Sequence, residues 1–248
     1  MKQTLFKHPP EFLLADSSEQ SAAALLEYIR SWADFGQEQT WLLPGGSSPV
    51  PFFKALAGSG LDLSRLTFFL TDERIVPKTH DASNYRLLTD HFYAGIDNEE
   101  HRPDICVFYD PELDRATNDR MLREQLDRLP PVTFALMGIG TDAHTASLFP
   151  HKAQNFKPGD WLYAHYHSGD RLERVSLSFD FLNAAERMAF LCTGEAKRDI
   201  LQTVCTLPYD PESYPVQYFF RHFDRPLVLA GDEAAWGAAR RALMPETQ

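Results

Sequence analysis

Cysteine is scarce in this 248-residue sequence: the three, Cys106, Cys192 and Cys205, lie far apart. An odd number without paired spacing argues against a disulfide framework and favours reduced thiols and a cytoplasmic location. The nine histidines form no H-E-x-x-H motif and no paired Cys/His spacing, so no metal site is predicted. A long apolar run is also missing, as is a small-residue cleavage site near the start. We therefore expect neither a transmembrane span nor a signal peptide.

Basic residues are in deficit as well, with 24 Lys and Arg against 35 Asp and Glu and a formal net charge of -11. This balance argues against nucleic-acid and anionic-membrane partners, because both are polyanions. A small phosphorylated ligand remains compatible, since a local nest of N–H groups and one or two basic side chains can hold it. Repeats, low-complexity tracts and Gly/Ser linkers are absent, which favours a single domain over residues 1–248.

Short apolar runs alternate along the chain with segments of helical periodicity. We expect strands over residues 40–43, 66–70, 105–108, 132–137, 161–167, 174–179, 188–193 and 226–231. We expect helices over residues 18–35, 51–58, 83–95, 111–129, 181–187, 194–204 and 232–243, the first opened by a capping box of Asp16 and Glu19. This order predicts an α/β fold with a largely parallel, doubly wound sheet between two helical layers. Residues 155–174 are the least regular, and we expect a flap there.

Polar residues follow several of the expected strands, at the sheet edge where ligands bind in such folds. Residues 44–49 carry Gly45, Gly46 and Ser47 between a strand and a helix. Glycines let the backbone approach a ligand, and N–H groups at a helix start can cradle a phosphate. The same string is also typical of a tight turn with a serine cap.

Two more of these loops carry cations. Arg74 follows Asp72 and Glu73 at the end of a strand, where it can clamp an anion or polarise a carbonyl. Lys197 lies in the first turn of an expected helix, a poor place for a cation unless an anion binds there. The alternatives are a local salt-bridge cluster for Arg74 and a solvated surface lysine for Lys197.

A third kind of loop holds Asp142 and His144 behind two glycines. A histidine at a helix start feels the positive end of the helix dipole, which favours the neutral imidazole that a general base requires. Asp142 can orient that imidazole. The alternative is that Asp142 is an ordinary helix cap and His144 a packed polar residue.

Four segments together resemble the blocks of the 6-phosphogluconolactonases, from Trp41 to the last helix: GGSSP, FFLTDERIVPKTHDASNYRLL, LMGIGTDAHTASLFP and RVSLSFDFLNAAERMAFLCTGEAKRDIL. The resemblance implies a three-layer α/β/α sandwich that hydrolyses 6-phosphoglucono-1,5-lactone to 6-phosphogluconate without a metal. We expect no cofactor and a monomer or homodimer. The resemblance implies that the phosphate is held by Gly45, Gly46, Ser47 and Lys197. It also implies that Arg74 contacts the substrate and that Asp142 and His144 form the catalytic pair; we place Asp72 and Thr145 among the substrate-binding residues.

The sequence departs from the family pattern at two places. Ala143 stands where the family usually has glycine, and the usual Lys-Pro-Pro stretch before RVSLS is missing, so the resemblance assigns no role to Arg171 or Arg174. Three alternatives remain. A glucosamine-6-phosphate deaminase usually has an acidic residue where Leu148 to Pro150 stand. A dinucleotide enzyme would use the G-x-G-x-x-A string at residues 138–143. A sugar-phosphate sensor would bind without turnover.

Overall fold

The computed structural model describes residues 5–106, 109–152, 162–165 and 172–244, with backbone only for 162–165. The strands are β1 (Glu11–Ala15), β2 (Gln39–Leu43), β3 (Leu66–Leu70), β4 (Asp72–Arg74), β5 (Asp104–Ile105), β6 (Val132–Met137), β7 (Leu162–His165), β8 (Arg174–Leu177), β9 (Arg187–Cys192) and β10 (Leu227–Asp232). The α-helices are α1 (Ser18–Arg30), α2 (Val50–Ala57), α3 (Asn84–Phe92), α4 (Arg115–Arg128), α5 (Phe179–Asn183), α6 (Arg198–Thr206), α7 (Gln217–His222) and α8 (Glu233–Leu243). Short 3₁₀ turns lie at Tyr93–Gly95, Glu99–His101 and Glu195–Lys197.

The main sheet has seven strands in the order β1-β10-β9-β6-β2-β3-β5, and all its registered pairs are parallel. The chain runs outward from β2 through β3 to β5, then returns to β6 and runs outward the other way through β9 to β10. The neighbouring strands β2 and β6 therefore form a topological switch point, where ligands bind in such sheets. The prediction of a largely parallel, doubly wound sheet is confirmed.

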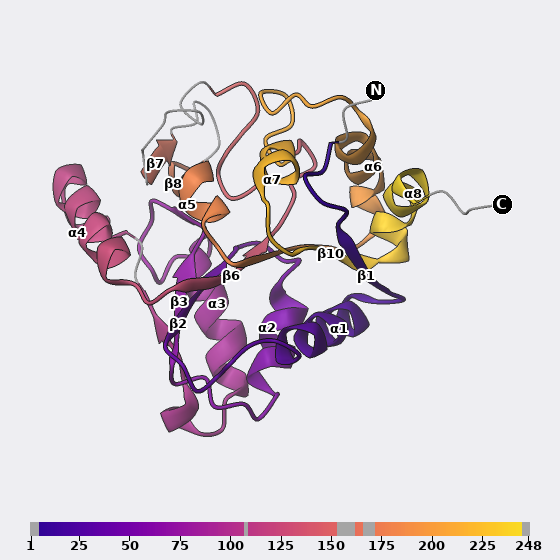
Figure 1. Ribbon diagram of the computed structural model, residues 1–248. Coiled ribbons are helices and arrows are strands. Elements are labelled where there is room, and N and C mark those ends of the chain that lie inside the picture. Colours follow the sequence, from indigo (N-terminus) through magenta and orange to yellow (C-terminus); the bar gives the residue numbers. More distant parts are fainter. Residues whose placement is uncertain (1–4, 107–108, 153–161, 166–171, 245–248) are drawn as a thin grey trace.

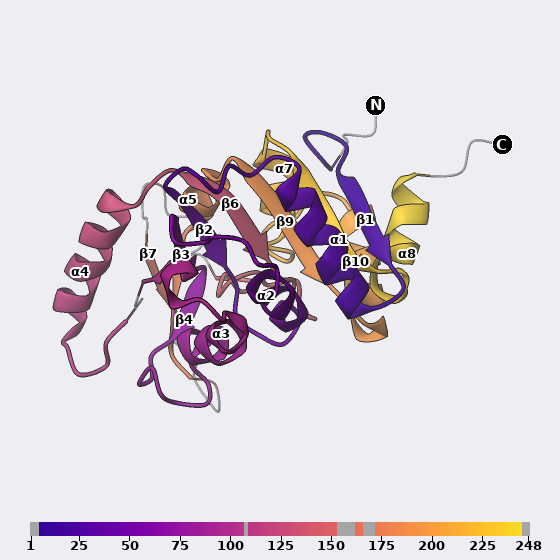
Figure 2. The same cartoon turned by 90° about the horizontal axis from the view of Figure 1, so that it is seen from below.

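Helices cover both faces of this sheet (Figures 1 and 2). Figure 1 shows α1, α2 and α3 on one side and α5, α6, α7 and α8 on the other, while α4 stands beside the β3/β5 edge. This is the expected three-layer sandwich. A second, antiparallel sheet has the order β4-β8-β7, and only Thr71 separates its strand β4 from the end of β3.

Aromatic side chains fill much of the core. Strand β2 is buried along its whole length, and Trp41 within it contacts Phe68 and Phe134 on the strands to either side. The last residues of β2, β3, β6 and β9 are buried in this tightly packed core. Their backbones therefore have little room to move, and the loops that follow them leave the sheet in fixed directions.

Several expected elements differ from those observed. Residues 72–74 were expected as a loop and are a strand, because their backbone pairs with β8 across the register Asp72↔Ser176 to Arg74↔Arg174. Strand β1 and helix α7 were not expected. The cap of α1 is Ser17, one residue later than the predicted Asp16, and its hydroxyl accepts from the Gln20 backbone N–H at 3.2 Å. The Gln20 side chain accepts from the Asp16 N–H at 3.1 Å, so it does not close a capping box on Ser17. The expected flap over residues 155–174 falls mostly outside the described residues.

Candidate active site

A cavity of about 320 Å³ opens at the carboxyl edge of the sheet, over the switch point between β2 and β6. It is lined from the segments that follow β2, β3, β6 and β9, all neighbours in the sheet, and from β8; the segment after β3 contributes strand β4 and the start of α3. Most of the predicted site residues line it, namely Gly45, Gly46, Ser47, Asp72, Arg74, His144 and Lys197. Residues up to about 150 positions apart in the chain are thus brought into one site.

The loop after β2 is shaped by a close neighbour. The side chain of Asn84 fills the space that a Cβ at Gly45 would need, so only glycine fits there. Gly46 has φ +84, and open space lies around its Cα on the side where a Cβ would be. Its backbone can therefore approach a ligand closely, just ahead of helix α2.

The Asp72-Glu73-Arg74 strand places its three charges differently. Asp72 is buried, lines the cavity, and accepts a hydrogen bond from the Ser147 hydroxyl at 2.6 Å. Arg74 also lines the cavity, and its Nη1 donates to the Ala82 carbonyl at 2.7 Å. The charges are therefore not a simple surface salt-bridge cluster, and the guanidinium is held at the cavity wall by backbone.

Glu73 ties this strand to the start of helix α3. Its buried carboxylate accepts from the backbone N–H groups of Asn84 and Tyr85 at 2.7 and 2.8 Å, and from the Ser83 hydroxyl at 3.1 Å. Burial raises the pKa of Glu73 above its ordinary value, although these hydrogen bonds act in the opposite direction. The contacts fix the loop whose Ala82 carbonyl holds Arg74.

Asp142 and His144 form a side-chain pair through Asp142 Oδ1 and His144 Nδ1. Burial raises the pKa of Asp142, but the hydrogen bonds and charge of His144 outweigh it and lower that pKa to about 2. The carboxylate is thus ionised at neutral pH and can accept from Nδ1–H, which leaves Nε2 as the basic nitrogen. The geometry suits a general base with its orienting partner.

The expected helix at His144 is wrong. The segment 138–150 consists of turns and an isolated bridge between Thr145 and Leu148. The backbone closes on itself, with Gly140 N donating to the His144 carbonyl at 2.8 Å and Ala143 N donating to the Gly140 carbonyl at 3.0 Å. The argument from a helix dipole therefore does not apply, and Asp142 is not a helix cap.

Ala143 has φ +68, the left-handed conformation that favours glycine. Its side chain is fully buried, and its carbonyl accepts from Val216 N at 3.3 Å. Despite the strain, His144 still lines the cavity and keeps its contact with Asp142. The departure from the family's glycine therefore leaves the pair assembled.

Replacing Ala143 with glycine changes the free energy of unfolding by less than about 1 kcal/mol, because relief of left-handed strain offsets the loss of a buried methyl group worth about 0.8 kcal/mol. Because the pair is already in place, kcat should stay within about threefold of the parent value. Thermal unfolding and steady-state kinetics measure both. A gain in kcat above about tenfold would show instead that Ala143 displaces His144.

Cations gather in this cavity although the chain as a whole is acidic. Arg74, Arg174 and Lys197 line it, and Asp72 is the one acidic residue among the described lining. Lys197 is half-buried, and its Nζ donates to the Ile139 carbonyl at 2.5 Å. A small anion entering from solvent therefore meets a locally positive site.

Some site residues lie elsewhere or were missed. Thr145 is buried and does not line the cavity, and Arg171 falls outside the described residues. Asn84, Ser147 and Arg174 were not counted as site residues. Asn84 lines the cavity, and its buried Oδ1 accepts no hydrogen bond from the described residues. The SNY and HTAS strings contain the first two, but sequence alone does not show their contacts.

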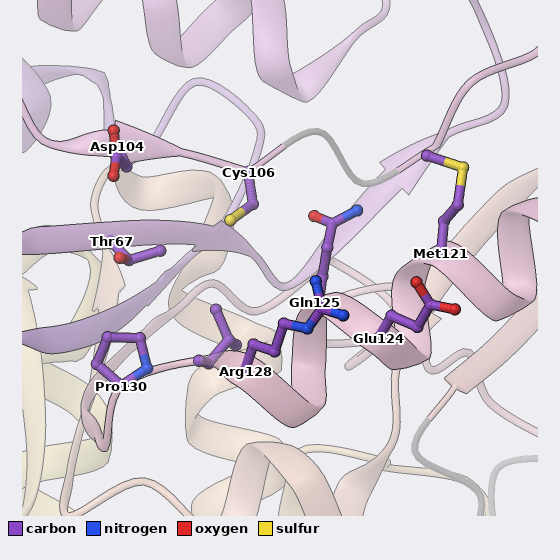
Figure 3. Close-up of a pocket in the computed structure, with 9 residues that line it drawn as sticks. Thr67, Asp104, Cys106, Met121, Glu124, Gln125, Arg128 and Pro130 are labelled. Atoms are coloured by element: carbon purple, nitrogen blue, oxygen red, sulfur yellow. The ribbon is translucent and has the colours of Figure 1, made fainter.

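A second cavity of about 360 Å³ lies where α4 passes the β3/β5 edge (Figure 3). Its lining includes Thr67, Asp104 and Cys106 on the sheet side and Met121, Glu124, Gln125 and Arg128 on α4. Burial raises the pKa of the Cys106 thiol to about 11, so it is no thiolate nucleophile at neutral pH. With no histidine in its described lining, this cavity offers no comparable general base.

Treatment with a chelator such as EDTA should leave kcat unchanged. Neither the sequence motifs nor the described part of the structure brings together three His, Cys, Asp or Glu side chains that could hold a metal ion. Kinetics before and after chelation and dialysis test this. Loss of activity that a divalent ion restores would contradict it.

Within the described residues, no helix is long and apolar enough to cross a bilayer.

The fold is shared with solved structures at low identity. A 6-phosphogluconolactonase from Shewanella baltica superposes with a TM-score of 0.78 at 21% identity, covering 92% of this chain and 99% of that one. A monomeric glucosamine-6-phosphate deaminase has a TM-score of 0.72 at 15% identity, over 92% and 99% of the two chains. The fold therefore does not separate the two activities.

Sequence comparison is more specific. The family described as glucosamine-6-phosphate isomerases/6-phosphogluconolactonase matches residues 15–228. A 6-phosphogluconolactonase of Haemophilus influenzae is 33% identical over 184 residues, covering 70% of this chain and 76% of its own length. A second, from Synechocystis, is 31% identical over 185 residues, covering 72% and 76%. On these sequence matches, this chain belongs to the glucosamine-6-phosphate isomerase/6-phosphogluconolactonase family, with 6-phosphogluconolactonases among its relatives.

Proposed function

We propose that this protein hydrolyses 6-phospho-D-glucono-1,5-lactone to 6-phospho-D-gluconate. The observation that carries the proposal is the single cavity in which His144, Arg74 and Lys197 meet the Gly45–Gly46 loop. It combines a general base with donors for a phosphate and for a developing oxyanion. The lactonase relatives support the choice of substrate.

The phosphate binds between Lys197 and the Gly46–Ser47 backbone, which places the lactone ring toward His144. Nε2 of His144 takes a proton from water as the water oxygen bonds to the lactone carbonyl carbon. Arg74 or backbone N–H groups stabilise the oxyanion of the tetrahedral intermediate. The carbonyl then re-forms, the bond to the ring oxygen breaks, and His144 returns its proton to that oxygen. A δ-lactone is a reactive ester, so no serine or cysteine nucleophile is required.

The alternatives receive less support. The position where a deaminase usually carries its acidic group holds Leu148 and Phe149, both buried and apolar. A dinucleotide site requires the glycine string to open a helix, and none begins within residues 138–150. A sensor that binds without turnover is disfavoured because the His144–Asp142 pair is intact.

A direct assay with freshly generated 6-phosphogluconolactone tests the proposal, with spontaneous hydrolysis subtracted. We expect saturable turnover well above the blank. A rate no greater than the blank would contradict the proposal. If the protein still bound the sugar phosphate, that result would favour a sensor that binds without turnover.

We also propose a cytoplasmic location and a monomeric or homodimeric state. The free thiols of Cys106, Cys192 and Cys205 support the location, because such thiols persist in a reducing compartment. The acidic net charge supports a small-molecule substrate rather than a nucleic-acid partner.

A further inference from the structure

Phe149 contacts the candidate general base directly. Its ring lies against the imidazole of His144, with ring centroids 4.6 Å apart and planes tilted by 34°. The ring is only 3% exposed, so it is a fixed part of the protein interior. The imidazole therefore rests on a rigid apolar surface beside the cavity.

The Phe149 ring also packs against the guanidinium of Arg174, from another part of the chain. Cζ of Arg174 lies 5.6 Å from the Phe149 ring centroid, a cation–π distance. Arg174 lines the cavity from β8, opposite Arg74 in the strand register, and its Nη1 is 3.9 Å from Asp72 Oδ2. Phe149 thus supports the general base and a cavity-lining guanidinium at once.

The backbone holds Phe149 in place independently of those two contacts. Leu148 N donates to the Thr145 carbonyl at 3.0 Å, which closes the turn before Phe149, and Leu148 is fully buried. Two residues beyond Phe149, His151 N donates to the Glu212 carbonyl at 2.7 Å. The ring is therefore anchored on both sides along the chain.

The two contacts of His144 constrain different motions. The Asp142 carboxylate holds the imidazole at Nδ1. The Phe149 ring packs against the imidazole and limits its tilt. Gly140 also lies close to the ring, because a Cβ there would overlap His144 Nδ1. Together the contacts fix the direction of Nε2, and small errors in such a direction are costly: about 1 Å of misplacement can lower a rate about 100-fold.

We infer that Phe149 is a positioning residue for the reaction, holding the His144 imidazole and the Arg174 guanidinium in register on one aromatic ring. The inference rests on the proposed lactonase function. It concerns the lactone end of the substrate, whereas Lys197 serves the phosphate end. Substitution of Phe149 should therefore lower kcat rather than raise KM, and it should lower kcat equally for phosphorylated and unphosphorylated lactones.

The test compares Phe149→Leu, Phe149→Tyr and the control Phe223→Leu. Phe223 is equally buried at 2% exposed, and it lines a hollow with Leu227 at the start of β10, at the opposite edge of the sheet from the site. We expect Phe149→Leu to lower kcat about 10- to 100-fold on 6-phosphogluconolactone and on D-glucono-1,5-lactone, with KM changed less than about fivefold. Phe149→Tyr keeps the ring face and should restore most of kcat.

Thermal unfolding of the same preparations corrects for the folded fraction. Phe223→Leu should lose comparable stability and keep its kcat per folded molecule. If Phe149→Leu loses no more kcat than that control, or if Phe149→Tyr is no better than leucine, the positioning role is wrong. An inactive parent protein would instead refute the proposed function itself.

Discussion

Replacing His144 with alanine should lower kcat by about two to four orders of magnitude, the usual contribution of a positioned general base. The side chain lines the cavity, its Nδ1 is held by Asp142, and Nε2 remains for the water. Steady-state kinetics on 6-phosphogluconolactone, corrected for spontaneous hydrolysis, measure the loss. KM should change much less, because the phosphate contacts remain.

The pH dependence gives a second measure of the same role. A general base acts only in its unprotonated form, so kcat/KM should fall when the solution is made acidic enough to protonate the base. The pKa of Asp142 is lowered to about 2, so Asp142 is already ionised well below neutral pH and should add no second step near neutrality. The fall should vanish in His144→Ala.

A purely structural His144 gives the opposite outcome: His144→Ala would lower the melting temperature and leave turnover per folded molecule intact. The catalytic role predicts little change in melting temperature, because the side chain is 29% exposed and its removal leaves no sealed cavity in the core. Normal turnover per folded molecule in His144→Ala would reject the mechanism. Asp142→Asn keeps the shape but removes the charge, and it should lower kcat less than the loss of the imidazole.

The sequence was sufficient to predict a parallel sheet, and to predict that most of the candidate site residues lie at one edge of it, for a simple physical reason. Parallel strands end at one edge, so polar loops after residues 43, 70, 137 and 192 have to meet there. The order of the strands could not be read from the alternation alone. Neither could strand β1, a short edge strand whose side chains are mostly half-buried and which carries no clear alternation.

The missed parts of the site depend on contacts between distant residues. Ser147 holds Asp72 across 75 positions, and Arg174 reaches Phe149 from strand β8. Neither pairing has a local sequence signal. The error at His144 has a local cause: a helix was expected after the glycines, but hydrogen bonds from Gly140 and Ala143 close a turn first, with left-handed backbone at Ala143.

Removing the ammonium group of Lys197 should weaken binding of the substrate phosphate and leave the rate of the chemical step nearly unchanged. Lys197 lines the cavity with Gly45, Gly46 and Ser47, on the strand-end loop next to that of His144 in the sheet order. A charge-assisted hydrogen bond to phosphate is worth about 1.5–3 kcal/mol. Lys197→Ala should therefore raise KM for 6-phosphogluconolactone about 10- to 100-fold and lower kcat much less, because this interaction is the same in ground and transition states.

The unphosphorylated lactone supplies the decisive comparison. D-glucono-1,5-lactone lacks the group that Lys197 is proposed to bind, so its kcat/KM should barely change in Lys197→Ala. Lys197→Met, which keeps the apolar stem, should behave like alanine, and the exposed Lys54→Ala on α2 should leave both substrates unaffected. Lys197 also donates to the Ile139 carbonyl beside the glycine turn of His144, so a structural role would disturb the general base as well. Equal losses on both lactones would therefore assign Lys197 to the support of that turn and not to the phosphate.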